Sequence, residues 1–505
     1  MLVTHSGDSQ LTASTAQLSD RQTSLLLFSL PLAALAGGMA WGMRGQYGHE
    51  TGAMIFGILV GFVIVLLYLP HGSALQAARA IGLFTLAIGF GGSMTYGQTV
   101  GLTMDHGVHG NIADPHWNAA AYRWGMLGLA IKGGLWIGFG GLFLGVGLST
   151  KRYSPREMLW LGIAMLALFF LGRWLINTPF DPEQRQLPVV YFSDHWQWEA
   201  AENVKPRREL WGGMLLALAG LFGFVAAIKR DRLAVNLGLW GIIGGLGFPI
   251  GQSIQAASHW DSETFMRTSW WHIGVNSWNR MEVTFGLIAG FSIALGCWLN
   301  RRKIAQLNAA DDVSLSPTLE GWLIGSYFYV LLVGWYFASS IFGLVHQYGL
   351  LLGLLPMVAI VGGRYAPFLY VLPTVALSIV VKTYLAKFRE ADYVGSSIGL
   401  LFLVTIPMGM LIWLALYFAR RSQAGWSARS FAGVGLPLTA TLYFWLNFTF
   451  FSFPWGWFAD WRGLLAQHQS GGIYVVGWLV LSVAGITAYF RRSPANKPLN
   501  DRTTR

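Results

Sequence analysis

Long apolar runs joined by short polar connections constrain the fold of this chain more than any other feature. The hydrocarbon layer of a bilayer is about 30 Å thick, so a helix that crosses it needs about 20 mainly apolar residues. The segments that fit are 24–41, 51–69, 80–100, 122–148, 157–177, 210–228, 233–255, 283–300, 320–343, 347–362, 366–384, 396–419, 431–453 and 472–490. We therefore predict an all-α fold, a polytopic integral membrane helix bundle with about fourteen transmembrane helices. The segment 347–362 is short enough to be re-entrant, which would change the count.

The composition excludes the main alternatives to a membrane bundle. Charged residues make up 11% of the chain of 505 residues, less than half of the roughly 25% found in soluble domains. Aromatic residues make up 15%, which argues against disorder. The single cysteine, Cys297, excludes an internal disulfide framework. A bacterial outer-membrane barrel would show alternating segments of about ten residues instead of continuous apolar runs.

The basic residues predict the orientation of the bundle. The net charge is +11, but Lys and Arg gather between apolar runs, which is the positive-inside pattern and argues against a nucleic-acid partner. The clusters fall in alternate connections, at 151–156, 229–232, 301–303, 420–429 and 491–505. We expect a multi-pass protein of the plasma (inner) membrane with both termini in the cytoplasm. The connection with Lys382, Lys387 and Arg389 runs against the rule.

The same pattern predicts five parts along the chain. The polar residues 1–23 include a single Arg, unlike the short basic start of a signal peptide, so we interpret 24–41 as the first transmembrane helix. The predicted parts are a cytoplasmic N-terminal tail (1–23), a first transmembrane bundle of about eight helices (24–300), a cytoplasmic linker (301–319), a second transmembrane bundle of about six helices (320–490) and a cytoplasmic tail (491–505).

A Gly-Gln pair recurs in the predicted first bundle. The three copies are Gly45-Gln46, Gly97-Gln98 and Gly251-Gln252. The stretch 91–100 around the second pair resembles the stretch 245–254 around the third. This echo suggests internal duplication, in which glycine-broken helices surround one site, as in many transporters.

A second echo relates residues 56–62 to residues 285–291, with Glu50 and Glu282 upstream of the two copies. The alternative to duplication is simple helix packing, because small residues four positions apart let two helices approach closely. Gly57/Gly61 has that spacing. The sequence leaves both interpretations open.

The connection between the first two segments holds a dense set of polar side chains, Arg44, Gln46, His49 and Glu50. So short a connection cannot rise far above the bilayer, and ionisable groups held near it are costly unless paired or hydrated. Arg44 suits bidentate binding of an anionic group, and Glu50 suits proton exchange. The structural alternative is an interfacial turn in which Arg44 pairs with Glu50.

Two further stretches could hold the side chains of a functional site. His106, His109, Asp114 and His116 offer metal ligands, but their spacing matches no established metal signature, so a solvated polar loop is the alternative. Trp270 and Trp271 precede Arg280 and Glu282, a composition that fits either a sugar site or the interfacial aromatic belt.

Lys132 lies inside the apolar segment 122–148. A buried ammonium group needs a carboxylate partner or a water-filled cavity, and we name Glu50 or Glu282 as its candidate partner. The alternative is that Lys132 lies near a helix end and extends to the interface.

These patterns favour a transporter, a permease or flippase-like protein for a polar, sugar-like or anionic solute, with an outward-facing site and proton coupling. The expected solute-binding residues are Arg44, Gln46, Gln98, Gln252, Trp270, Trp271 and Arg280, and the expected proton-coupling residues are Glu50, Glu282, His49 and Lys132. No catalytic residue and no cofactor are predicted, since phosphate-loop, zinc-protease and serine-hydrolase motifs are absent from the sequence. The expected partners are membrane lipids and a small polar solute or lipid-linked substrate.

Two other functions remain open. One is a membrane-embedded transferase or hydrolase that acts on a lipid-linked substrate at the outer leaflet, with the long loop 178–209 as its cover. The other is an assembly or sensor subunit without chemistry of its own.

Overall fold

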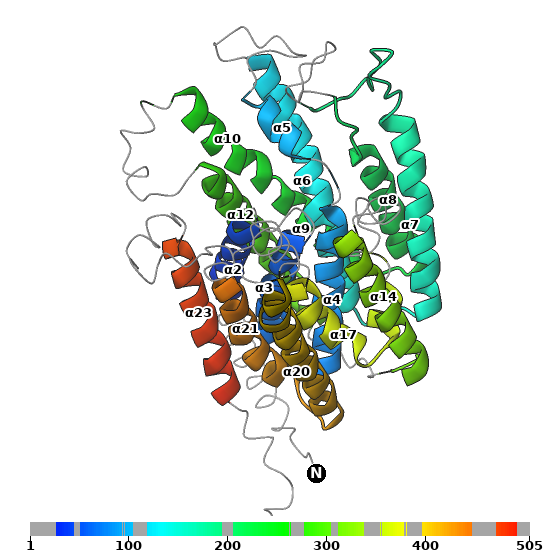
Figure 1. The fold of residues 1–505 in the computed structure, drawn as a ribbon, viewed down its shortest axis with the longest axis vertical. Helices are drawn as coiled ribbons and strands as arrows, with labels where there is room; N and C mark the ends of the chain where they lie inside the picture. The colour runs from blue at the N-terminus through cyan, green and yellow to red at the C-terminus, as the bar shows by residue number, and fades with distance from the viewer. Residues whose placement is uncertain are drawn as a thin grey trace, which may run out of the picture.

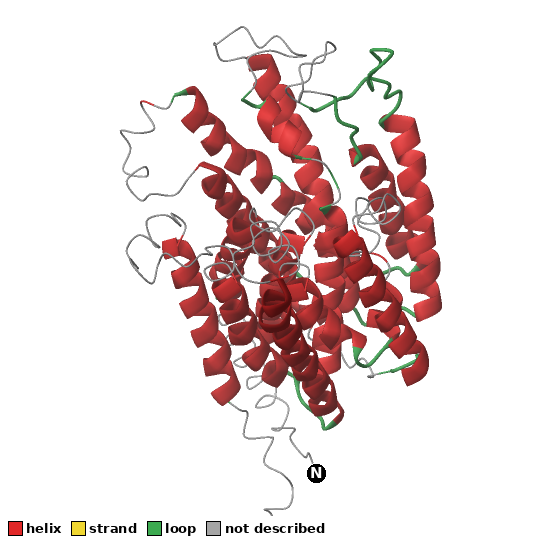
Figure 2. Ribbon diagram, viewed as in Figure 1, coloured by secondary structure: helices red, strands yellow, loops and turns green. Residues whose placement is uncertain are grey.

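The computed structural model shows an all-helical protein. Within the described residues there is no β-strand, and only two isolated bridges, Ser73–Ser427 and Asp181–Gln186, pair in a strand-like way (Figure 2). The structure describes residues 27–44, 51–92, 94, 96–104, 119–193, 206–261, 263, 277–304, 312–337, 354, 356–377, 380, 396–446 and 471–491. The predicted fold class is therefore confirmed at the level of an all-α protein.

Each predicted apolar segment overlaps at least one described helix, although the predicted segments 80–100 and 233–255 each run across an interruption between two helices (Figure 1). The bounds of the helices are α2 (Ser29–Arg44), α3 (Thr51–Tyr68), α4 (Ala74–Gly91), α5 (Gly97–Leu102), α6 (Ala119–Gly147), α7 (Pro155–Ile176), α8 (Trp211–Gly223), η1 (Phe224–Ile228), α9 (Arg232–Gly245), α10 (Gly247–Trp260), α12 (Ser277–Leu299), α13 (Arg301–Ile304), α14 (Pro317–Phe337), α16 (Met357–Gly362), α17 (Ala366–Leu369), η4 (Tyr370–Thr374), α19 (Ser396–Gly399), η6 (Leu400–Thr405), α20 (Ile406–Gln423), α21 (Ala428–Trp445) and α23 (Gly471–Phe490).

Eight helical stretches in the described part of the chain are long and apolar enough to cross a bilayer. They are Ala74–Gly91, Ala119–Gly147, Pro155–Ile176, Trp211–Ile228, Arg232–Trp260, Ser277–Leu299, Ser397–Gln423 and Ile473–Phe490. These helices are consistent with a membrane helix bundle. The predicted count of fourteen is not confirmed, because the described helices at the other predicted segments, α2, α3, α14, α16, α17 and α21, fall outside this set.

Glycines form the tightest helix contacts of the bundle. Gly141 and Gly145 of α6 abut the backbone of Leu237 and Ala234 on α9, and Gly286 of α12 abuts Gly37 of α2. Any larger side chain at these positions would overlap backbone atoms of the facing helix. The glycine spacing therefore serves close helix packing, as in many membrane bundles.

The basic connections meet at one end of the bundle. Arg79 near the start of α4 donates to the carbonyl oxygens of Asp312 and Gly363, each at 2.9 Å. Lys229 pairs with Glu157 of α7 at 2.9 Å, and the amide of Ala428 donates to the carbonyl of Gly72. Connections far apart in sequence thus form one face, although its assignment to the cytoplasm stays a prediction.

An aromatic cluster fills the centre of the bundle. The ring of Trp41 on α2 lies 5.0 Å from Trp136 of α6 and 4.3 Å from Phe285 of α12, measured between centroids. Phe285 in turn stacks on Phe248 of α10 at 4.7 Å. The C-terminal helices pack onto this N-terminal core, α21 against α3 and α23 against α2. The division into five parts stays a prediction.

Candidate functional site

Two helices of the bundle are broken at matching positions. α4 ends at Gly91 and is followed by the short helix α5, and α9 ends at Gly245 and is followed by α10. Gly91 and Gly245 are the first residues of the two sequence stretches that resemble each other. In the second copy, Pro249 has no N–H for the carbonyl of Gly245 four residues earlier, which explains why the helix cannot continue undisturbed. The two interruptions differ in size: residues 92–96 separate α4 from α5, whereas Leu246 alone, in helical conformation, separates α9 from α10, so that Arg232–Trp260 is one kinked helical stretch.

Both breaks contact the same part of α6. Gly91 packs against Trp136, such that an added Cβ would lie 2.6 Å from a ring carbon of that residue. Gly245 packs against the backbone of Gly133 so closely that neither residue has room for a side chain. These contacts bring both helix interruptions against the turn of α6 that directly follows Lys132.

Lys132 is a buried ammonium near the middle of α6. Its side chain is 1% exposed, and that of its partner Glu209 is 0% exposed. The Nζ atom donates to Glu209 Oε1 at 2.8 Å and to the Thr99 hydroxyl of α5 at 2.6 Å. The expectation that Lys132 lies within the helix and not at its end is confirmed.

The ion pair closes into a ring with the long loop. The Thr99 hydroxyl donates to the carbonyl of Phe192 at 2.7 Å, while the amide of Phe192 donates to Glu209 Oε2 at 2.9 Å. Trp124 of α6 also donates from its indole nitrogen to the carbonyl of Tyr191 at 2.9 Å. Tyr191 and Phe192 of the loop are therefore held against α5 and α6 by hydrogen bonds with Thr99, Trp124 and Glu209.

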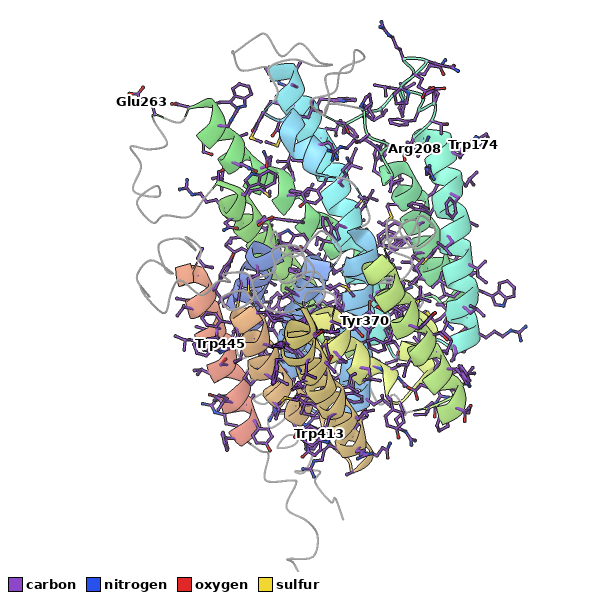
Figure 3. The ribbon with its side chains drawn as sticks, viewed as in Figure 1. Trp174, Arg208, Glu263, Tyr370, Trp413 and Trp445 are labelled. Carbon is purple, nitrogen blue, oxygen red and sulfur yellow. The ribbon has the colours of Figure 1, made fainter. Side chains whose placement is uncertain are left out.

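The end of the bundle that carries this loop lies opposite the basic face. Figure 3 shows Arg208 and Trp174 at the end that also carries Glu263, far from Trp413 near the opposite end. Arg208 precedes Glu209 and lies over the ring of Phe180 at 5.1 Å. The exposed Arg208 is therefore the sequence neighbour of the buried Glu209.

Two predicted glutamines lie on the short helices beyond the breaks. Gln252 of α10 is fully buried and donates to the Thr103 hydroxyl at 2.8 Å. Gln98 of α5 accepts from the Arg207 guanidinium at 2.7 Å when its amide is oriented by the hydrogen-bond network. The structure therefore brings the second and third Gly-Gln copies to the same region of the molecule.

Two buried amide oxygens beside this site have no hydrogen-bond partner in the described structure. They are Oε1 of Gln252 and Oε1 of Gln255, which lies one helical turn further along α10. A buried acceptor without a donor costs about 1–3 kcal/mol. Such groups are expected to be satisfied by water or by a bound polar molecule.

Glu282 and Arg280 lie on α12, which packs against α10 and α2. Glu282 is 3% exposed. Gly251 of α10 abuts the backbone of Met281, and Gly42 of α2 abuts Val283. The end of α2, where Arg44 is the last residue, therefore lies level with the start of α12.

Several predicted site residues lie outside the part that the structure describes. They are Gln46, His49, Glu50, His106, His109, Asp114, His116, Trp270 and Trp271. In the described ranges no group of three His, Cys, Asp or Glu side chains could hold a metal ion. The metal-site hypothesis and the roles of these residues stay predictions.

The sequence analysis missed the carboxylate of the ion pair. It named Glu50 or Glu282 as the candidate partner of Lys132, which stays a prediction because Glu50 lies outside the described residues, and it did not name Glu209, which pairs with Lys132. One signal was present, because Glu209 stands directly before the apolar segment that begins at residue 210. A carboxylate at that edge is favourable only with a partner, but the distance of 77 positions along the chain hid the partner.

These features describe a class and not a family. Eight long apolar helices in the described part of the chain, and a buried ion pair beside two helix interruptions, are consistent with a helical bundle suited to a membrane. No family model matches the chain, and no curated protein or solved structure matches it either.

Proposed function

We propose that this protein is a multi-pass transporter of the inner membrane for a polar, sugar-like or anionic solute, driven by protons. The observation that carries the proposal is the buried ion pair of Lys132 and Glu209 beside two helix interruptions. Transporters commonly place solute and ion sites at helix interruptions, where backbone groups are no longer engaged within the helix. Ionisable groups buried in such a bundle are costly and usually functional.

The buried amides support binding of a hydroxyl-bearing solute. The free acceptor atoms of Gln252 and Gln255 can accept hydrogen bonds from sugar hydroxyls. In the proposal Arg44, Gln46, Gln98, Trp270, Trp271 and Arg280 complete the solute site. Glu50, Glu282 and His49 exchange protons during transport, and Lys132 takes part in the same proton coupling.

Proton flux in proteoliposomes tests the proposal without a known solute. The full chain is reconstituted with a pH-sensitive dye inside the vesicles, and glucose, glucuronate, gluconate and succinate are added outside in turn. We expect one chemical class to drive proton entry. Glu282→Gln should abolish this proton flux yet keep the thermal stabilisation of the protein by the same solute, while the exposed loop variant Glu183→Gln should behave like the wild type. The proposal would be contradicted if none of the solutes drove proton flux, or if the flux were unchanged in both Glu282→Gln and Glu50→Gln.

One observation favours the alternative, a transferase or hydrolase for a lipid-linked substrate. The loop that ends at Glu209 is fastened over α6 through Phe192, as a cover over an active site would be. Thermal stabilisation by a lipid-linked sugar alone, lost on addition of a chelator, would support this enzyme over the transporter.

A further inference from the structure

A polar cavity lies at the basic end of the bundle, opposite the end that carries the long loop. It has a volume of about 890 Å³ and lies where the start of α4, the connection from α6 to α7, and residues 312–314 meet. We call it the basic cavity. Its charged lining consists of Arg79, Lys151, Arg152, Lys229, Glu157 and Asp312. Four cations against two carboxylates give the basic cavity a net positive charge.

The charges of the basic cavity differ in how they are held. Lys229 pairs with Glu157 at 2.9 Å and lies 4.8 Å above the Tyr153 ring. Arg152 pairs with Asp312 at 3.0 Å, but both side chains are largely exposed, so this pair is weak. Lys151 is exposed and makes no ion pair in the described part of the chain. Its charge is therefore available to an anion in the basic cavity.

The wall of the basic cavity also carries a buried donor. Gln76 is 8% exposed, and its Nε2 atom has no hydrogen-bond partner within the described structure. Arg79, one turn further along α4, is fixed by its bonds to the carbonyls of Asp312 and Gly363. An amide donor beside a fixed guanidinium suits an acceptor oxygen that carries negative charge.

An apolar groove continues from the basic cavity along α7. It has a volume of about 520 Å³ and shares Ser154 and Glu157 with the basic cavity. Apart from Arg156, its further lining is apolar, with Trp160, Ala164 and Ile228 among its members. Trp160 and Ile228 are 60% and 70% exposed. We call it the α7 groove.

We propose that the basic cavity and the α7 groove together bind one anionic phospholipid. The phosphate would lie near Lys151 and Gln76, and an acyl chain would lie along the α7 groove against Ala164. Basic pockets between membrane helices bind anionic headgroups by charge, and an adjoining apolar groove adds recognition of the chain. A free phosphate or nucleotide would use the basic cavity alone. The proposal does not depend on transport.

Native mass spectrometry of the full chain in detergent tests this proposal. The probes are phosphatidylglycerol and phosphatidylcholine with identical acyl chains, and glycerol 3-phosphate as a headgroup without chains. We expect phosphatidylglycerol to bind at least about fivefold more tightly than phosphatidylcholine, since one basic residue near the surface contributes about that factor. Glycerol 3-phosphate should bind far more weakly than either lipid.

Matched variants separate the two parts of the site. Lys151→Gln should remove most of the preference for phosphatidylglycerol, whereas Lys303→Gln, an exposed lysine outside the basic cavity, should keep it. Ala164→Phe should weaken binding of both lipids, whereas Ala167→Phe, on an exposed part of α7 outside the groove, should not.

Three results would overturn the proposal. They are equal affinity for the two lipids, equal effects of Lys151→Gln and Lys303→Gln, and binding of glycerol 3-phosphate as tight as that of phosphatidylglycerol with no effect of Ala164→Phe. The last would assign the basic cavity to a soluble phosphate compound. All four substitutions lie at exposed positions, so the variants are expected to fold.

Discussion

Loss of one member of the Lys132–Glu209 ion pair is expected to destabilise the fold strongly, whereas replacement of both members is expected to have little effect. Each charge loses hydration on burial, and the mutual attraction with the added bonds from Thr99 and Phe192 offsets that cost. Removal of one partner takes the ion pair away from a buried charge, at a cost of about 3–5 kcal/mol. Replacement of both by apolar residues of similar volume is often neutral or stabilising. A pair of this kind is thus weak evidence for a purely structural role.

The difference between losing one charge and replacing both predicts how stable the single and double variants should be. Glu209→Leu and Lys132→Met should each lower the free energy of unfolding by about 3–5 kcal/mol, and the double variant should recover most of the loss because no charge remains unpaired. The measurement is thermal unfolding in detergent, with Glu183→Leu as the exposed control. A double variant whose loss equals the sum of the two single losses would show that the two side chains contribute independently, and would contradict this account. Loss of proton flux in a stable double variant would support a functional role.

At the scale of helices, the contact between Gly133 of α6 and Gly245 of α9 sets the position of the second break. A Cβ on either residue would overlap backbone atoms of the other, whereas a Cβ on Gly134 would meet only Ile242 at an ordinary 3.5 Å. We expect Gly133→Ala to destabilise the protein by about 1–3 kcal/mol through overpacking. Gly134→Ala should be neutral or slightly stabilising, because alanine favours helix. Equal thermal stabilities of the two variants would contradict this account.

The break itself is the second feature at this scale. Pro249→Ala would supply an N–H for the carbonyl of Gly245 and so favour a continuous helix over α9 and α10. We expect the thermal stability of this variant in detergent to equal or exceed that of the wild type. Its solute-driven proton flux should fall at least about tenfold, because the interruption is part of the proposed site. Unchanged flux in this variant would separate the break from function.

At the scale of the whole molecule, orientation is open to a chemical test. Cys297 is the only cysteine of the sequence and is fully buried, so single exposed cysteines can be added to the native chain. With an impermeant maleimide on intact spheroplasts, Glu183→Cys in the long loop should be labelled, and Arg152→Cys on the basic face only after permeabilisation. The wild type should stay unlabelled in both conditions. The reverse pattern would invert the predicted orientation.

Much of the fold was readable from local patterns. Each predicted apolar segment coincides with described helix over at least part of its length, because hydropathy and helix length depend on residues close together in the chain. The predicted segments 80–100 and 233–255 ran through both helix interruptions, and only the glycine echo at 91–100 and 245–254 pointed to broken helices there. Lys132 was recognised as a buried charge by its apolar surroundings alone.

The tertiary structure decided which distant groups meet. It joined Lys132 to Glu209 across 77 positions, set both helix breaks against one turn of α6, and gathered the basic connections around a cavity that adjoins an apolar groove. The sequence determined the helical class, the apolar segments and the candidate charges through local composition. Pairing of charges depends on helix neighbours and loop paths, which follow from side-chain packing between helices and leave no periodic signal in the chain.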